Sequence, residues 1–182
     1  MSARRFAGVA YVVAALTRCA PAVPPPEKKP APPLILQRVD GSGRVSLAEH
    51  QGKVLLVDLW ATWCGPCLTE LPHLQKLSET YDPKEFQMLG IVLESGEPAE
   101  IQDFIRGKGI TYLNLLGQDG TKEAFGPFIG YPMKYLIDKQ GYVVKSYLGV
   151  VGEKLQQDVR QLVRTGALPA AGGAGPSESS TH

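Results

Sequence analysis

The chain has 182 residues, which is enough for one domain with a tail at each end. Hydrophobic residues make up 43% of the sequence, an ordinary share for a globular protein and sufficient for a single core. The net charge of +1 provides no bulk attraction to nucleic acid, so the composition favours no nucleic-acid partner.

The first 23 residues have the pattern of an export signal. Arg4 and Arg5 precede an uncharged apolar stretch at residues 6–16, which is shorter than a membrane-spanning helix and typical of the central region of a signal peptide. Three fates stay open: cleavage near Ala22, lipid attachment at Cys19, or retention as an uncleaved anchor. Each predicts an extracytoplasmic domain, and the last two predict a membrane tether. An unstructured apolar N-terminus on a cytoplasmic protein is the alternative.

Biased composition marks the segments that flank the domain. Residues 24–33 lie in a proline-rich, charged stretch that favours an extended linker and cannot pack a core. Residues 169–182 are rich in Gly, Ala and Ser and have no apolar pattern, which predicts a disordered tail. The domain itself is expected at residues 34–168.

Strands and helices alternate along this domain. Strands are expected where apolar and β-branched residues run together, and helices where apolar residues recur every three or four positions. The expected strands cover residues 34–39, 45–47, 53–60, 86–93, 111–116, 133–137 and 142–147. The expected helices cover residues 65–80, 98–106, 121–125 and 153–164. This order predicts an α/β sandwich with a mixed sheet that ends in a hairpin and a helix.

A Cys-Gly-Pro-Cys turn connects the apolar strand at 53–60 to the helix at 65–80. Its first thiol, Cys64, is expected at the helix N-terminus, where the helix dipole and the unpaired N–H groups favour a thiolate. A thiolate attacks disulfides, and Cys67 can resolve the mixed disulfide by closing a ring with Cys64. Half of a zinc site and a purely structural disulfide are the alternatives. Zinc is disfavoured because the chain offers no second pair of ligands with suitable spacing.

The segment 57–67, Val-Asp-Leu-Trp-Ala-Thr-Trp-Cys-Gly-Pro-Cys, resembles the active-site segment of the thioredoxin superfamily, above all its extracytoplasmic TlpA/ResA-like branch. The resemblance covers residues 34–168. It implies a thioredoxin-like three-layer sandwich with a mixed β-sheet, an N-terminal β-hairpin, and a strand–helix insertion near residues 89–115.

The resemblance also implies two acids that handle protons. Asp58 matches the buried acid of thioredoxins, which can take the proton of Cys67 when that thiol must attack. Glu94 matches an acid placed near the dithiol in ResA-like proteins, where it is expected to tune thiol acidity. The alternatives are a strand-end acid that reaches solvent for Asp58 and a helix-capping loop acid for Glu94.

A substrate ledge is implied beside the dithiol. Pro132 is expected to form a cis peptide bond next to the cysteines, and the alternative is an ordinary trans proline at a strand start. Tyr131 departs from the small or β-branched residue usual before this proline, which puts the choice of partner in doubt. Trp63, Gly65 and Pro66 complete the expected ledge, and Trp60 is expected to pack against the site together with Trp63.

The sequence therefore predicts an extracytoplasmic thiol–disulfide oxidoreductase that needs no metal and no cofactor beyond its own redox-active disulfide. By resemblance it is a monomer that reduces disulfides of exported proteins, apocytochromes c among them, with electrons from a membrane dithiol carrier. Two alternatives stay open, a disulfide-forming oxidant of the same fold and a non-catalytic chaperone or adaptor. A peroxidase is disfavoured because no Thr-x-x-Cys site accompanies the pair.

Overall fold

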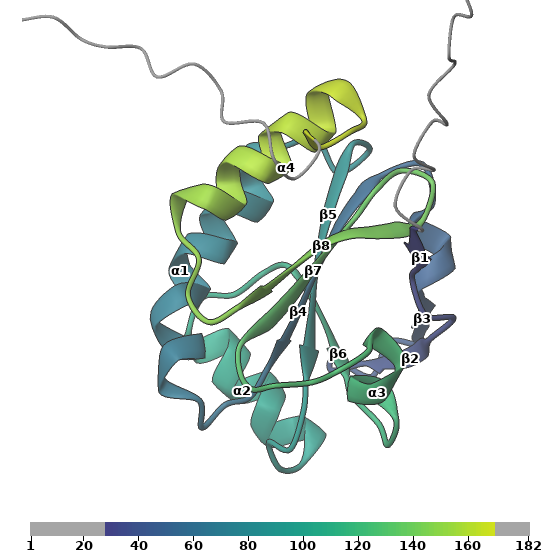
Figure 1. The fold of residues 1–182 in the computed structure, drawn as a ribbon. Helices are drawn as coiled ribbons and strands as arrows, with labels where there is room; N and C mark the ends of the chain where they lie inside the picture. The colour runs from purple at the N-terminus through teal and green to yellow at the C-terminus, as the bar shows by residue number, and fades with distance from the viewer. Residues whose placement is uncertain (1–27, 170–182) are drawn as a thin grey trace, which may run out of the picture.

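The structure is a computed structural model that describes residues 28–169 (Figure 1). Its strands are β1 (Lys29–Pro30), β2 (Ile35–Arg38), β3 (Arg44–Ser46), β4 (Val54–Trp60), β5 (Phe86–Val92), β6 (Leu113–Leu116), β7 (Met133–Ile137) and β8 (Tyr142–Leu148). Its helices are η1 (Leu47–His50), α1 (Gly65–Thr80), α2 (Pro98–Gly107), α3 (Thr121–Phe125) and α4 (Glu153–Thr165). The strands form one mixed sheet in the order β1-β8-β7-β4-β5-β6-β2-β3.

Strand β4 lies in the middle of this sheet, and all of its residues are buried. It pairs in parallel with β5 and antiparallel with β7. Side chains alternate between the two faces of a strand, so β4 contributes to two cores. Leu56 and Trp60 pack with residues of α1, α2 and α4, whereas Val57 and Leu59 pack with the β2–β3 hairpin, η1 and α3. Helices on both sides of the sheet confirm the thioredoxin-like three-layer fold (Figure 1).

The expected insertion corresponds to α2 and β6, which follow β5 and extend the sheet by one parallel strand. The N-terminal hairpin β2–β3 then pairs with β6 through an antiparallel contact. The strand expected at residues 45–47 ends one residue earlier than predicted, because Leu47 begins the short helix η1 instead of continuing the strand. Ser46 caps this helix by accepting a hydrogen bond from the Ala48 N–H, and the Glu49 carboxylate accepts one from the Ser46 N–H.

The predicted signal, Cys19 and residues 170–182 of the predicted tail lie outside the described residues. Residues 28–33, the end of the predicted linker, are described by the structure. Here β1 pairs with the edge strand β8, and the Ala31 N–H donates to the Gly141 carbonyl at 2.8 Å. Lys28 forms an ion pair with the buried Asp138 at 2.9 Å. Residues 28–33 therefore pack on the sheet edge, a place where a strand tolerates Pro30. Within residues 28–169, no helix combines the length and apolarity needed to cross a bilayer.

Candidate active site

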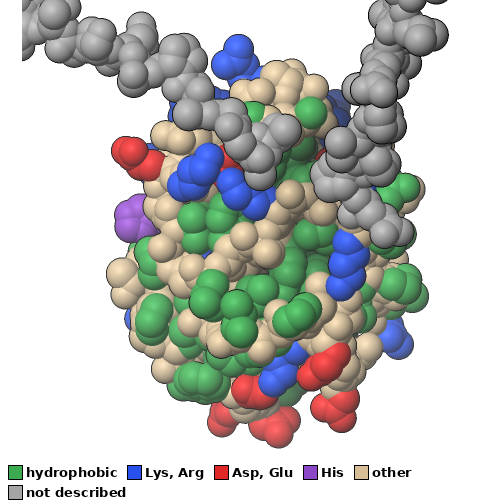
Figure 2. Space-filling view, in the orientation of Figure 1, with side chains coloured by type: hydrophobic (Ala, Val, Ile, Leu, Met, Phe, Trp, Pro, Cys, Tyr) green, Lys and Arg blue, Asp and Glu red, His purple; other side chains and the backbone are tan. Residues whose placement is uncertain are grey.

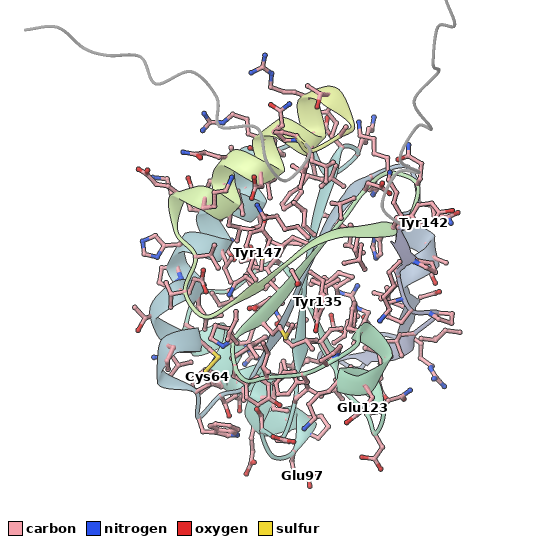
Figure 3. All side chains as sticks on the ribbon, in the orientation of Figure 1. Cys64, Glu97, Glu123, Tyr135, Tyr142 and Tyr147 are labelled. Atoms are coloured by element: carbon pink, nitrogen blue, oxygen red, sulfur yellow. A yellow bond between two sulfur atoms is a disulfide. The ribbon has the colours of Figure 1, made fainter. Side chains whose placement is uncertain are left out.

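The dithiol lies where β4 ends and α1 begins. Cys64 is the N-cap of α1, and Gly65 and Pro66 occupy its first positions. Cys64 and Cys67 form a disulfide with their Cα atoms 5.2 Å apart (Figure 3). The Cys67 N–H donates to the Cys64 sulfur at 3.2 Å. No acidic residue lies in the first helical turn, so nothing there opposes the positive end of the helix dipole. After reduction, this position favours a thiolate on Cys64.

The two cysteines differ slightly in exposure. Cys67 is 1% exposed, and both cysteines belong to the core cluster between the sheet and α1. Cys64 is 5% exposed and lies beside Gly65 and Pro66, which are both exposed. A partner can therefore approach Cys64 across this turn, while Cys67 faces the protein interior. This asymmetry fits an outer attacking thiol and an inner resolving thiol.

An aromatic row borders the dithiol. Trp63 is 61% exposed, and the Tyr131 ring meets it edge-on with centroids 5.4 Å apart. Phe128 continues the row, with its centroid 4.8 Å from that of Tyr131. The Tyr131–Pro132 peptide bond is cis, as the resemblance implied. Hydrophobic side chains gather across the middle and lower part of the face shown in Figure 2. Elsewhere in the described residues, Ile129, Leu148 and Val150 are also large hydrophobic side chains that are exposed.

Glu94 holds this row in place. Its carbonyl accepts a hydrogen bond from the Trp63 indole at 2.7 Å, and its carboxylate accepts one from the Tyr131 hydroxyl at 3.2 Å. Lys122 forms an ion pair with the same carboxylate at 2.5 Å. Lys122 also donates a hydrogen bond to this carboxylate, and that bond lowers the pKa of Glu94. The proton-transfer role expected for Glu94 stays a prediction, and its contacts point to positioning of the aromatic row.

Three ionisable side chains meet in the interior, on the side of the sheet that α1 covers. Asp58, Lys134 and Glu70 are 1%, 0% and 2% exposed. The Lys134 Nζ lies 2.5 Å from the Glu70 Oε2 and 3.5 Å from the Asp58 Oδ1. Burial raises the pKa of Asp58 to about 6, an effect that Lys134 opposes and Glu70 reinforces. Asp58 thus lies in the dry environment expected for a proton acceptor that works near neutral pH.

Sequence reasoning found Asp58 but missed Lys134 and Glu70. A signal for each was present. Glu70 follows Cys67 by three positions, on the helix face that also buries Leu71 and Leu74. Lys134 interrupts the apolar run of β7, a strand whose five residues are all buried. A lysine or a glutamate inside such a pattern requires a buried partner.

Trp60 differs from Trp63 in that it packs inside the protein. It is fully buried, and its indole donates to the Asn114 Oδ1 at 3.1 Å. Gly90 makes room for this bond, since a Cβ there would lie 2.1 Å from the same oxygen. Trp60 belongs to the same core cluster as Cys67 and therefore packs on the interior side of the dithiol, whereas Trp63 lies at the surface next to Cys64.

Comparison with known proteins decides the family. The profile of the Redoxin family matches residues 26–163, well over half of the chain. The chain belongs to the Redoxin family. With its paired cysteines Cys64 and Cys67, this redoxin is a thiol–disulfide oxidoreductase of the thioredoxin fold.

Relatives and solved structures agree with this assignment. The chain is 33% identical to the thiol:disulfide interchange protein DsbE of Pseudomonas aeruginosa over 131 residues, which cover 71% of each chain. It is 30% identical to the thiol-disulfide oxidoreductase ResA of Geobacillus thermodenitrificans over 134 residues, which cover 72% of each. The crystal structure of a DsbE-like protein from Chlorobium tepidum superposes with a TM-score of 0.68 at 25% identity, covering 75% of this chain and 96% of that one.

Proposed function

We propose that this redoxin reduces disulfides of exported proteins outside the cytoplasm, apocytochromes c among its substrates. The observation that carries the proposal is the buried Asp58, which lies on the face of the sheet that packs against Cys67 and whose pKa burial raises to about 6. A reductant must resolve its mixed disulfide with the substrate quickly. A proton acceptor near the inner thiol speeds that step, because it helps Cys67 to become the attacking thiolate. The Gly-Pro pair between the cysteines resembles the reducing members of the superfamily, and the relatives named ResA and DsbE support thiol–disulfide exchange.

Turnover consists of two exchanges at sulfur. The Cys64 thiolate attacks a substrate disulfide, forms a mixed disulfide and releases one substrate thiolate, which takes a proton from solvent. Cys67 then gives its proton to a carboxylate, which we assign to Asp58, and attacks the Cys64 sulfur. The Cys64–Cys67 disulfide forms, and the second substrate thiolate leaves. Two electrons have passed from the dithiol to the substrate, and the acceptor carboxyl returns its proton to solvent or to the leaving thiolate.

The oxidised protein must then be reduced again by another dithiol. We propose a membrane dithiol carrier as the donor and a monomeric domain held at the membrane face. The apolar stretch at residues 6–16 and Cys19 support a tether or an export signal, since either places the domain outside the cytoplasm. The aromatic row of Trp63, Tyr131 and Phe128 provides a surface on which both the donor and the substrate can dock.

The reduction potential of the Cys64–Cys67 pair tests the direction. The soluble domain is equilibrated in glutathione or dithiothreitol buffers, and its thiols are counted by alkylation. A potential at or below about −250 mV, near the thioredoxin level, is expected for a reductant. A potential near about −120 mV would identify a disulfide-forming oxidant instead. A pair that does not cycle at all would leave only the chaperone or adaptor interpretation.

The substrate class is tested by trapping. Cys67→Ser removes the resolving thiol, so Cys64 should hold its partners as stable mixed disulfides in cells. The matched control is the double variant Cys64→Ser, Cys67→Ser, which keeps the same surface and cannot form a disulfide at the active site, so that any capture through Cys19 is common to both variants. Exported cysteine proteins are expected among the captured partners of the single variant, and cytoplasmic partners alone would contradict the proposal.

A further inference from the structure

We propose that Lys134 is a positioning residue that makes the proton acceptor behind Cys67 usable at neutral pH. It joins the Asp58 and Glu70 carboxylates into one buried cluster that exchanges a single proton during each turnover. The inference rests on the dithiol exchange proposed above and holds whichever direction that exchange takes. No contact between Lys134 and a substrate is required, so its action is indirect.

The sheet register places the cluster behind the inner thiol. Lys134 on β7 lies directly opposite Asp58 on β4, and both point to the side of the sheet that α1 covers. Glu70 lies one helical turn after Cys67 on the buried face of α1. The ammonium of Lys134 thus lies between a strand acid and a helix acid, 3.5 Å from one and 2.5 Å from the other.

Backbone groups fix the remaining atoms of the cluster. The Lys134 Nζ also donates to the Gly149 carbonyl at 3.3 Å, and the second Glu70 oxygen accepts from the Val151 N–H at 3.1 Å. The Gly149 N–H donates to the Pro132 carbonyl at 2.8 Å. The cluster therefore holds the loop after β8, which in turn contacts the proline of the substrate ledge.

Among residues 28–169, other titratable groups near the cluster supply no second positive charge. Tyr112 contributes a buried hydroxyl with no hydrogen-bond partner among the described residues, and its pKa is raised well above the ordinary value by burial and by the two acids. Tyr147 is the β8 neighbour of Lys134, but its hydroxyl donates to Asp158 on α4 at 2.7 Å. Lys145 and Lys154 also bond to Asp158. In the described part of the chain, Lys134 is thus the cation that contacts Asp58 and Glu70.

The charge count explains what the lysine does. With all three groups ionised, the cluster carries one net negative charge in a dry core, and one proton brings it to neutrality. The cluster can therefore accept the single proton that Cys67 loses and become neutral in doing so. Without Lys134, two carboxylates would share the site with no countercharge, and such a pair holds its first proton firmly. The acceptor carboxylate would then already be protonated when Cys67 must lose its proton.

The test uses single turnover of the reduced protein with Ellman's reagent. Attack by Cys64 releases the first thionitrobenzoate in a phase that depends on reagent concentration. Attack by Cys67 releases the second in a phase that does not. The rate of the second phase is measured against pH, and its midpoint reports how readily Cys67 loses its proton. A general loss of stability would not move this midpoint selectively.

Lys134→Met should raise the midpoint of the second phase by about one pH unit or more, which slows that phase about tenfold or more at a pH below both midpoints. Glu70→Gln should move the midpoint the other way, because it leaves one acid with the lysine. The double variant Lys134→Met, Glu70→Gln restores one net negative charge and should return the midpoint toward wild type. It also removes the unpaired acid that could prevent the single lysine variant from folding. Lys145→Met is the matched control, a lysine on the neighbouring strand that pairs with another buried acid.

The outcomes separate the inference from the function. A wild-type protein that shows no concentration-independent release of thionitrobenzoate would overturn the dithiol exchange, and the inference with it. A wild type with two phases, combined with Glu70→Gln and Lys134→Met midpoints equal to the wild-type value, would overturn the role of Lys134 alone. Should the single lysine variant not fold, equal midpoints for Glu70→Gln, the double variant and wild type would overturn it in the same way. Opposite shifts in the two single variants, with Lys145→Met unchanged, would support it.

Discussion

Replacing Asp58 by asparagine should make the oxidised protein more stable at neutral pH. The folded state holds a proton on Asp58 up to about pH 6, whereas an ordinary aspartate in the unfolded chain loses it near 3.8. Between these values the folded state binds more protons than the unfolded state, so the free energy of unfolding falls as the pH rises. The interval from 3.8 to about 6, at about 1.36 kcal/mol for each pH unit, amounts to about 3 kcal/mol.

The asparagine would keep the shape of the side chain and remove the charge, while Lys134 retains Glu70 at 2.5 Å. We therefore expect Asp58→Asn to gain up to about 3 kcal/mol over wild type at pH 7 and to gain little at pH 4. Urea unfolding of both proteins with the disulfide intact measures this difference, and equal m-values show that the unfolded states are comparable.

A matched control has the opposite sign. Asp158 is also buried, which opposes its ionisation, but hydrogen bonds from Lys145 and Lys154 lower its pKa overall. A carboxylate with a lowered pKa stabilises the fold above its ordinary pKa, so Asp158→Asn should lose stability at pH 7. An Asp58→Asn variant that is less stable than wild type at pH 7, or that has the same advantage at pH 4, would show that Asp58 does not carry a raised pKa in the folded state.

Two further substitutions test the surroundings of the site. Gly90→Ala should lower the free energy of unfolding, measured in urea, by about 1–3 kcal/mol, because a Cβ would lie 2.1 Å from Asn114 Oδ1. Gly107→Ala is the control and should not destabilise the protein, because its Cβ would meet open space. Glu94→Gln should lower the pKa of Tyr131 from about 12, since burial and the Glu94 charge together raise it, and an unchanged phenol titration followed by ultraviolet absorbance would contradict the contact.

Local pattern was enough to predict most of the fold. The apolar run of β4 and the leucine stripe of α1 each show a clear pattern, and the structure has both elements at the expected positions. The short helix η1 was missed because it depends on two hydrogen bonds around Ser46 and not on a period. The edge pairing of residues 28–33 was missed because composition alone does not show which strand has a free edge.

The site was predictable only as far as its motif extends. The dithiol and Asp58 lie within one short segment, so a single stretch of sequence reveals them. Lys134 and Glu70 come from other elements, and their meeting with Asp58 depends on strand register and on the rotation of α1. Glu94 was expected at the thiols, but its contacts with Trp63 and Tyr131 follow from a left-handed backbone at φ 50°, which sequence does not reveal.

The buried cluster also bears on the choice between an enzyme and an adaptor. At neutral pH the buried, ionised Asp58 costs stability, because its pKa is raised in the folded state, and an uncharged residue of the same shape would avoid that cost. A binding module that never cycles its dithiol gains nothing from a proton acceptor behind Cys67, or from a lysine that keeps the acceptor empty. An enzyme gains the second exchange step. If Asp58→Asn stabilises the fold and slows only the release of the second thiol, the cost and the function belong to the same carboxylate, and the adaptor interpretation loses its physical basis.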